Sequence, residues 1–209
     1  MKKEIILVTI LFLMSAFAFA QTIENINYIS SYNDGLAAIK KDHQWAFINT
    51  NGDIVINFRN DLVATNHDDG EYPIFKNDRC LISKEKDGIS YFGYIDIFGK
   101  TVIEPQYLNA LNFVDNEAIV LVLIKEELGG NDVLGKNIVN YKYYDAVIDN
   151  NGHVIQYLTP KGFNVNLDKK YLRTPPKITS KRISDNLYAV MDENKKWTIQ
   201  KINKESDFQ

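Results

Sequence analysis

A pattern of turn and strand residues recurs along the chain, and it limits the possible folds more than any other feature. Each copy opens with an Asn/Asp turn and an apolar strand, continues to a strand led by an aromatic residue, and ends with a glycine turn and a third apolar strand. The turn glycines Gly52, Gly99 and Gly152 recur about every 50 residues. The leading aromatic residues recur at nearly the same spacing, as Trp45, Phe92, Tyr144 and Trp197. Since several features repeat in one order, we infer tandem repeats.

Four copies are expected, at about residues 33–60, 77–107, 115–158 and 185–201, the last of them partial. Asn51-Gly52 is typical of a two-residue type I′ hairpin, because both residues accept a positive φ. A single hairpin cannot bury its apolar face alone, whereas hairpins in tandem can. The sequence therefore predicts an all-β domain of tandem antiparallel β-hairpin repeats, stacked into a solenoid-like or propeller-like array.

Three segments depart from the simple repeat. Residues 118–124 are continuously apolar, which predicts a strand buried on both faces. Residues 125–136 are polar and glycine-rich, and we expect a surface loop there. Residues 159–180 contain prolines that cannot donate ladder hydrogen bonds, which predicts a linker or covering segment with one short strand at 163–167. No part of the chain after residue 20 shows helical periodicity.

The first 20 residues have the pattern of a secretory signal peptide. A short basic start precedes an apolar stretch, and Ala18-Phe19-Ala20 offers a small-x-small cleavage site. The alternative is an N-terminal membrane anchor, but the stretch is shorter than the roughly 20 residues that span a bilayer and no basic flank follows it. We expect cleavage after Ala20 and export of one soluble domain, residues 21–209, to the periplasm or the exterior.

Composition and spacing argue against several kinds of partner and site. The formal net charge is −3 and no run of Lys and Arg occurs, which argues against nucleic acid as a partner. The single cysteine, Cys80, lies in a strand-like run, and we expect a small buried residue rather than a reactive thiol. His43, His67 and His153 show no metal-ligand spacing. The polar cluster at 66–71 is expected to be a surface turn rather than a cation site, so we expect no metal and no cofactor.

Three stretches of the first two copies resemble the WG repeat of bacterial proteins. The pattern of that family runs roughly G-L-A-x-V, a polar turn, W-G-Y-I-D, and then x-G-x-x-V-I-x-P-x-Y. Residues 35–39 match the opening, 92–96 match the middle with Phe in place of Trp, and 99–107 match the end. The copies are degenerate, since Trp45 is followed by alanine and Trp197 by threonine. The resemblance implies an all-β repeat domain with a binding or scaffolding role, and it supplies no catalytic residues.

The function that these features favour is binding without catalysis. No serine or cysteine stands in a nucleophile context, while a carboxylate pair for glycoside hydrolysis is formed only in space. Strand alternation places Tyr141 and Tyr143 on one face, where exposed rings can stack on sugars or hold a partner chain. We take these two residues as a candidate binding surface, the alternative being that they cover the edge of a small core.

The sequence as a whole favours an exported, non-enzymatic binding or scaffolding module. Its expected partner is a protein or polysaccharide of the cell envelope or exterior. An exported hydrolase acting on polysaccharide or peptide is the alternative, and two carboxylates facing each other across a cleft would favour it.

Overall fold

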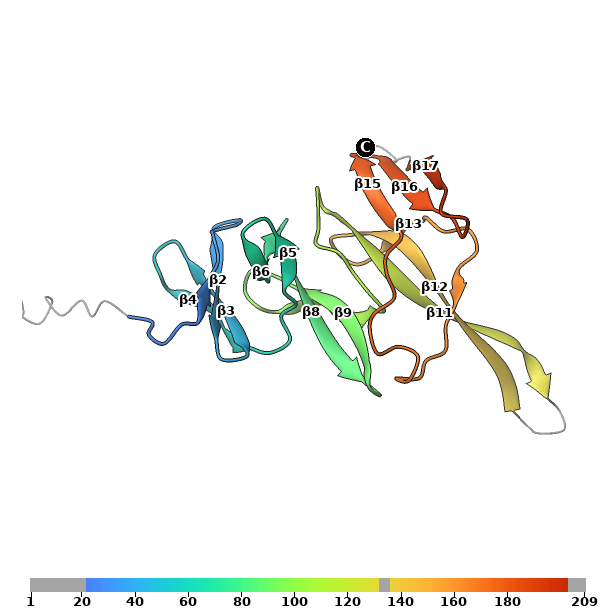
Figure 1. Ribbon diagram of the computed structural model, residues 1–209, viewed down its shortest axis with the longest axis horizontal. Coiled ribbons are helices and arrows are strands. Elements are labelled where there is room, and N and C mark those ends of the chain that lie inside the picture. Colours follow the sequence, from blue (N-terminus) through green and yellow to red (C-terminus); the bar gives the residue numbers. More distant parts are fainter. Residues whose placement is uncertain (1–21, 132–135, 203–209) are drawn as a thin grey trace, which may run out of the picture.

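The computed structural model describes residues 22–131 and 136–202, and every regular element in these ranges is a β-strand. All strand pairs are antiparallel, so the expected all-β fold is confirmed. The sheets formed by residues 28–59, 75–107 and 117–164 follow one another along the long axis, and the sheet of residues 180–201 lies beside the third of them (Figure 1). The expected signal peptide, residues 1–20, lies outside the described residues. No helix in the described ranges is long and apolar enough to cross a membrane.

The strands group into four sheets and one small hairpin. Sheet 1 contains β1 (Tyr28–Ile29), β2 (Leu36–Lys41), β3 (Gln44–Asn49) and β4 (Ile54–Arg59). Sheet 2 contains β7 (Phe75–Lys76), β8 (Arg79–Lys86), β9 (Ile89–Ile95) and β10 (Thr101–Tyr107). Sheet 3 contains β11 (Glu117–Asn131), β12 (Lys136–Asp149), β13 (Val154–Tyr157) and β14 (Phe163–Asn164). Sheet 4 contains β15 (Ser180–Ser184), β16 (Leu187–Met191) and β17 (Trp197–Lys201). The hairpin contains β5 (Thr65–His67) and β6 (Gly70–Tyr72).

The pairing registers identify equivalent positions in the four sheets. The central cross-strand pairs are Ala38–Phe47, Leu81–Tyr94, Ile119–Val147 and Ala189–Ile199. Two residues before the second member of each pair stand Trp45, Phe92, Asp145 and Trp197. Three of the four expected aromatic positions are thus equivalent, but Tyr144 is displaced by one residue, and its neighbour Asp145 takes the place. Spacing cannot resolve a shift of one residue within a tyrosine-rich strand, although such a shift moves a side chain to the opposite face.

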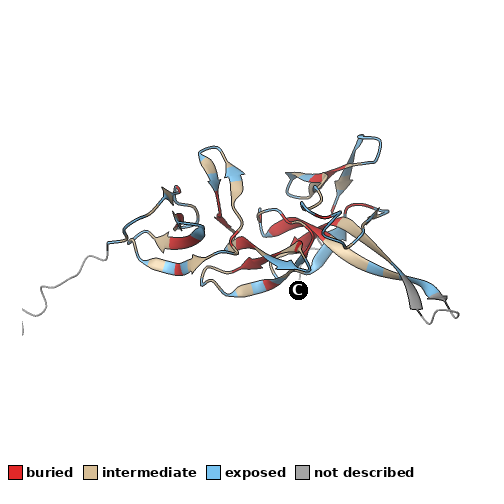
Figure 2. Cartoon of the chain, turned by 60° about the horizontal axis from the view of Figure 1, so that its bottom comes forward, coloured by how far each residue is buried: buried red, intermediate tan, exposed pale blue. Residues whose placement is uncertain are grey.

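Each main apolar cluster contains side chains from two consecutive sheets. Sheets 1 and 2 share a cluster that includes Trp45, Phe47, Cys80 and Ile82. Sheets 2 and 3 share one that includes Phe92, Tyr94, Ala118 and Val120. Sheets 3 and 4 share one that includes Ile119, Val147, Tyr188 and Val190. Neighbouring residues of one strand therefore face opposite neighbouring sheets, which explains the fully buried strand segments coloured red in Figure 2.

Strand β11 confirms part of the expectation for the apolar run. Residues 118–121 are buried, and successive side chains belong to different clusters, as expected for a strand covered on both faces. Residues 122–124 are only half-buried, because β11 and β12 continue beyond the neighbouring sheets as a long ribbon. The loop expected at 125–136 is instead largely strand, paired from Lys125–Tyr141 to Asn131–Lys136. Polar residues continue the ladder there because both faces of the ribbon accept water.

Equivalent loops connect β3 to β4, β9 to β10 and β12 to β13, and each of them is built on one side chain. The Oδ1 atoms of Asn49, Asp96 and Asp149 each accept hydrogen bonds from the backbone N–H groups two and four residues later. Gly52 has a φ of 85°, whereas Asn51 does not have a positive φ. The two-residue type I′ turn expected at Asn51-Gly52 is therefore wrong, because the side-chain bonds stabilise a longer loop.

Turns with two consecutive positive φ values occur elsewhere, immediately before β8 and before β11. Asn77 and Asp78 have φ values of 50° and 60°, and Asp115 and Asn116 have 50° and 63°. These are the dihedral signs of type I′ turns, which Asn and Asp tolerate better than other non-glycine residues. The Asn/Asp residues that open the second and third repeat copies therefore have a backbone role.

Replacing Asp149 by asparagine is expected to make the fold less sensitive to acid. Partial burial raises the pKa of its carboxyl, but hydrogen bonds from the backbone of His153 and Asn151 and from the His153 ring outweigh it and lower the pKa. A carboxyl with a lowered pKa stabilises the fold above its unfolded pKa, and this contribution is lost as pH falls through the folded value. Asparagine keeps the accepting oxygen without titrating, as Asn49 does in sheet 1. Thermal melts from about pH 7 to about pH 2 should show a shallower loss for the variant; parallel losses would contradict this.

Candidate binding groove

A groove lies between the segment that follows β13 and the inner side of sheet 4. One hollow, of about 330 Å³, is lined on one wall by Thr159, Pro160, Lys161 and Phe163. Its other wall comes from sheet 4 and its hairpin loop, and includes Val190, Met191, Asp192, Glu193, Asn194, Thr198 and Gln200. A second hollow, of about 420 Å³, is lined by Ile124, Tyr144, Gln156, Tyr157 and Leu158. Both hollows include Thr159, Pro160 and Gln200, so together they form one groove, which we call the β13–β17 groove.

Asp145 holds the two walls of the β13–β17 groove in place. Its backbone N–H donates to Thr159 Oγ1 at 3.1 Å, and its carbonyl accepts from Leu158 at 2.8 Å. Its carboxylate Oδ2 accepts from the N–H and Oγ1 of Thr179, at 3.0 and 3.1 Å, and from the Ser180 N–H at 2.8 Å. Asp145 is fully buried, and its Oδ1 has no hydrogen-bond partner among the described residues. One buried residue thus ties the end of sheet 3 to the start of sheet 4.

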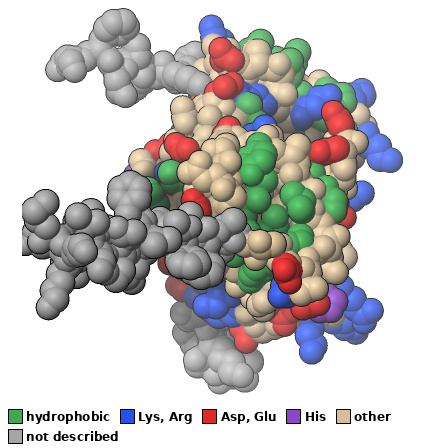
Figure 3. All heavy atoms as spheres, turned by 90° about the vertical axis from the view of Figure 1, so that its left-hand side faces the viewer, with side chains coloured by type: hydrophobic (Ala, Val, Ile, Leu, Met, Phe, Trp, Pro, Cys, Tyr) green, Lys and Arg blue, Asp and Glu red, His purple; other side chains and the backbone are tan. Residues whose placement is uncertain are grey.

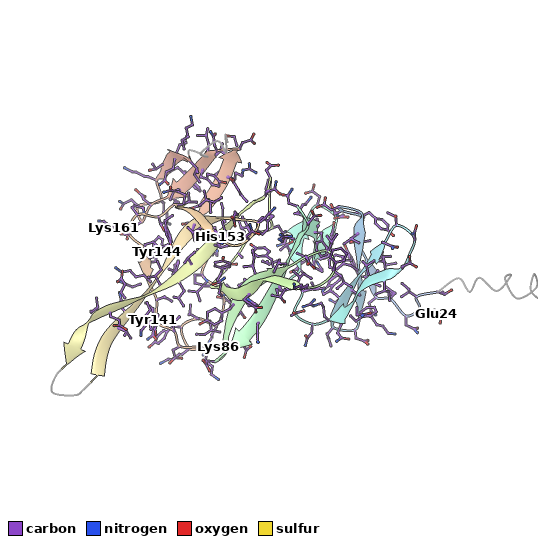
Figure 4. The ribbon with its side chains drawn as sticks, turned by 180° about the vertical axis from the view of Figure 1, so that it is seen from behind. Glu24, Lys86, Tyr141, Tyr144, His153 and Lys161 are labelled. Carbon is purple, nitrogen blue, oxygen red and sulfur yellow. The ribbon has the colours of Figure 1, made fainter. Side chains whose placement is uncertain are left out.

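Two tyrosines form the aromatic part of the groove. The Tyr144 and Tyr157 rings meet edge to face, with centroids 5.7 Å apart, and Tyr157 remains 42% exposed. The chain crosses close to the Tyr144 ring at Gly162, where an added Cβ would lie 2.4 Å from a ring carbon. Tyr144 and Lys161 project on the same side of the β12 ribbon, away from Tyr141 (Figure 4). The groove therefore combines a partly open aromatic pair with a nearby cation.

Polar groups complete the lining. Gln200 donates from Nε2 to the Leu158 carbonyl at 2.8 Å, which fixes its amide across the groove. The two lining carboxylates, Asp192 and Glu193, are adjacent in the loop between β16 and β17. Asp192 accepts the Lys196 N–H at its Oδ1, at 2.8 Å, in the same loop design as Asp149. Both carboxylates of the groove therefore come from one turn, and that of Asp192 is already hydrogen-bonded to the backbone.

The candidate surface at Tyr141 and Tyr143 lies on the other face of β12. Tyr143 is half-buried and stacks on Phe163, with ring centroids 5.3 Å apart. It packs against an apolar cluster that includes Leu121 and Leu172, and burial raises the pKa of its hydroxyl. Tyr141 is also half-buried. Sequence reasoning missed the open pair Tyr144 and Tyr157, which the alternation of β12 places opposite Tyr143 and which only the packing of sheet 4 turns into a groove.

The remaining sequence-predicted positions are explained by local structure. Cys80 is buried in β8, and desolvation raises the pKa of its thiol. His43 is exposed in the turn between β2 and β3, and His67 hydrogen-bonds to Thr65 Oγ1 at 3.0 Å. Within the polar cluster at 66–71, Asp69 accepts from the hydroxyls of Tyr72 and Ser31, which lower the pKa of its carboxyl. These bonds make the cluster a structural turn. In the described ranges, no three His, Cys, Asp or Glu side chains converge to hold a metal ion.

The surface at the N-terminal end carries both signs of charge. Lysine and arginine side chains alternate with acidic ones around that end, without a continuous patch of one sign (Figure 3). This distribution agrees with the small formal net charge of −3. Local hydrogen bonding and shape, rather than a strong overall field, are therefore the means by which this surface can select a partner.

Comparison with known proteins gives one match. Residues 92–123 match the family model described as WG containing repeat. No curated protein and no solved structure matches the chain. The matched span runs from β9 through β10 into β11, so it contains most of the residues that build the cluster between sheets 2 and 3. Its small second residue is required, because a Cβ on Gly93 would lie 2.3 Å from the Ile103 carbonyl oxygen. Over this segment, the chain is similar to the WG-repeat proteins.

Proposed function

We propose that this chain is an exported, non-enzymatic binding module that holds a polymer of the cell envelope or exterior, a polysaccharide or a protein segment, in the β13–β17 groove. The observation that carries the proposal is the lining of the groove, where the edge-to-face pair of Tyr144 and Tyr157 lies beside the amides of Gln156 and Gln200. Aromatic rings supply apolar contact while amides give direction through hydrogen bonds, which is the usual division of labour in a binding site.

The groove is formed before any ligand arrives. Asp145 bonds to Thr159 on one wall and to Ser180 in β15, the first strand of the sheet that forms the other wall, and Gln200 bonds across to Leu158. A site whose walls are already held together loses little conformational entropy on binding, and this favours affinity. The arrangement supports recognition of an extended chain, because the groove continues from Tyr157 past Pro160 to the loop at Glu193.

Binding is favoured over hydrolysis by the position of the acidic groups. Glycoside hydrolysis needs two carboxyl groups on opposite sides of the bond to be cleaved. In the β13–β17 groove the acidic residues Asp192 and Glu193 come from one turn, and Asp192 is engaged by the Lys196 N–H. Among the described lining residues, the wall opposite this turn offers Lys161 rather than a carboxylate.

We also infer that the sheets act as a stacked, solenoid-like scaffold. The shared clusters between consecutive sheets support this inference. A second support is a ladder of turns, in which the Asn77 N–H donates to Asp34 Oδ2 at 3.0 Å and the Asn116 N–H donates to Asn77 Oδ1 at 3.2 Å. Such a scaffold would hold the groove rigidly, since each sheet supports the next.

Tyr157→Ala is expected to weaken ligand binding by about fivefold or more, since truncating an aromatic anchor of a binding site costs more than about 1 kcal/mol. The purified chain would be screened on glycan and peptide arrays, and the best ligand titrated by calorimetry. Tyr171→Ala is the matched control, because Tyr171 is 63% exposed and lies outside the groove. Tyr141→Ala tests the face that the sequence favoured. Binding that is lost with Tyr141→Ala but kept with Tyr157→Ala would move the site to that face, and turnover abolished by Glu193→Gln would make the protein a hydrolase.

The export part of the proposal has its own test. Mass spectrometry of the protein recovered outside the cytoplasm should give a mature N-terminus at Gln21, because cleavage is expected after Ala20. Protein that retains residues 1–20 would contradict export by a cleaved signal peptide, and it would leave the binding test unaffected.

A further inference from the structure

We propose that the face of sheet 4 that points away from sheet 3 docks a second copy of this chain, giving a two-fold symmetric dimer joined end to end. We call this face the outer face of sheet 4, and it contains Leu187, Ala189, Trp197 and Ile199, with Lys181 beside them. This proposal is independent of the β13–β17 groove, which lies on the inner side of the same sheet.

Strand alternation assigns these residues to the outer face. Tyr188 and Val190 belong to the cluster shared with sheet 3, so the residues between and beside them in β16 point the other way. Ala189 pairs directly with Ile199, and directly paired residues share a face. The Lys181 Nζ lies 4.6 Å from the centre of the Trp197 ring, which places Lys181 on this face as well.

The outer face of sheet 4 has the composition of an internal interface. The register makes Trp197 and Ile199 equivalent to Trp45 and Phe47 in sheet 1. Those two side chains are 7% and 1% exposed, because sheet 2 covers them. Trp197 and Ile199 are 48% and 66% exposed, since no sheet follows sheet 4 in the described part of the chain.

The same positions in sheet 2 repeat the comparison. Phe92 and Tyr94 are 8% and 0% exposed beneath sheet 3. The repeat therefore builds a surface at these positions that is covered wherever a further sheet follows. An apolar sheet face of this kind, left open at the end of an array, gains free energy when another sheet covers it.

A second copy, docked through the same face, is the occupant that the geometry fits best. Head-to-tail docking would use the opposite face of sheet 1, where Ala37 and Ile39 are already buried, at 0% and 1% exposure, and where Ile29 at the edge is 62% exposed. A two-fold contact needs only the open outer face and closes without forming a filament. Because that face has few apolar side chains, we expect a contact smaller than the roughly 800 Å² per partner that a standard interface buries, and therefore a weak dimer.

Analytical ultracentrifugation of the purified chain over a range of concentrations tests the proposal. A monomer–dimer equilibrium with a dissociation constant on the order of 10–100 μM is expected for such a contact. The double variant Trp197→Asp with Ile199→Asp should weaken dimerisation at least about tenfold, since charged groups would be buried at the interface. Phe98→Asp is the control, because Phe98 is 82% exposed on sheet 2 and should leave the dimer unchanged. A monomer at every concentration, larger open oligomers, or a dimer unaffected by the double variant would each overturn the proposal.

Cysteine crosslinking keeps the test decisive if the double variant does not fold. Ile199→Cys should form a disulfide-linked dimer under mild oxidation, because a two-fold contact brings both copies of residue 199 together. The native Cys80 is buried and should not interfere. Phe98→Cys, at a position that is off the face and more exposed than Ile199, should crosslink much more slowly, and equal rates for the two variants would overturn the proposal.

Discussion

Trp45→Ala is expected to lower the free energy of unfolding by about 3–5 kcal/mol, the usual cost of truncating a large buried aromatic residue. Trp45 is 7% exposed and belongs to the cluster that sheets 1 and 2 share. Its ring meets Tyr28 edge to face, with centroids 5.7 Å apart, and Lys40 lies 5.1 Å from its centre. Chemical denaturation followed by circular dichroism would measure the loss.

The repeat supplies a matched control for this prediction. Trp197 is equivalent to Trp45 by register, but it is 48% exposed on sheet 4. Trp197→Ala, measured at a concentration where the chain is monomeric, should therefore change stability by about 0.5 kcal/mol or less. Equal losses at Trp45 and Trp197 would mean that the two tryptophans do not differ in packing, which would contradict the sheet-to-sheet arrangement.

Asp145→Ala is expected to cost about 2–5 kcal/mol and to release sheet 4 from sheet 3. The substitution leaves the buried N–H of Ser180 and the N–H and hydroxyl of Thr179 without their acceptor, and each unmet buried donor costs about 1–3 kcal/mol. The unpartnered Oδ1 offsets part of this cost, because its desolvation penalty disappears with the side chain. The net effect is destabilising, because the loss of three hydrogen bonds outweighs the removal of one unsatisfied buried oxygen.

Hydrogen exchange locates the effect of Asp145→Ala. Amides of β15–β17 should exchange faster in the variant, while those of sheet 1 stay protected, because Asp145 bonds only to the chain around sheets 3 and 4. Glu104→Ala is the control, since that carboxylate is exposed on β10 of sheet 2, and surface substitutions usually change stability by less than about 0.5 kcal/mol. Uniform loss of protection in all sheets would show that Asp145 supports global stability rather than the attachment of sheet 4.

The groove depends on the same residue, which connects stability with the proposed function. Asp145 takes the position at which sheets 1 and 2 carry Trp45 and Phe92. An aromatic residue there packs directly on the next sheet, as Trp45 does on sheet 2. The carboxylate instead binds the N–H groups of Thr179 and Ser180, at the start of β15. The departure from the repeat pattern thus coincides with the groove that the open aromatic pair lines.

The periodic features of the sequence were sufficient to predict the strands and most of their order. Turn residues at regular spacing and apolar runs between them are local signals, and hydrogen bonding between neighbouring strands follows from them. The buried strand at 118–121, the buried Cys80 and the match of 92–123 to the WG repeat agree with those expectations. The loop expected at 125–131 is wrong. These residues have little intrinsic preference for a strand, but they continue the pairing with β12 that the buried part of β11 begins.

By itself, the sequence determined the all-β fold and most of the places where the chain turns, since both depend on residues close together along the chain. Tertiary structure alone decided which alternate residues are covered, because burial depends on whether another sheet lies against a face. For that reason Trp45 is buried and Trp197 is exposed, although the repeat places both at one position. For the same reason Tyr143 packs against Phe163 while Tyr144 and Tyr157 line the groove, a distinction that alternation proposes but only the packing of sheet 4 against sheet 3 settles.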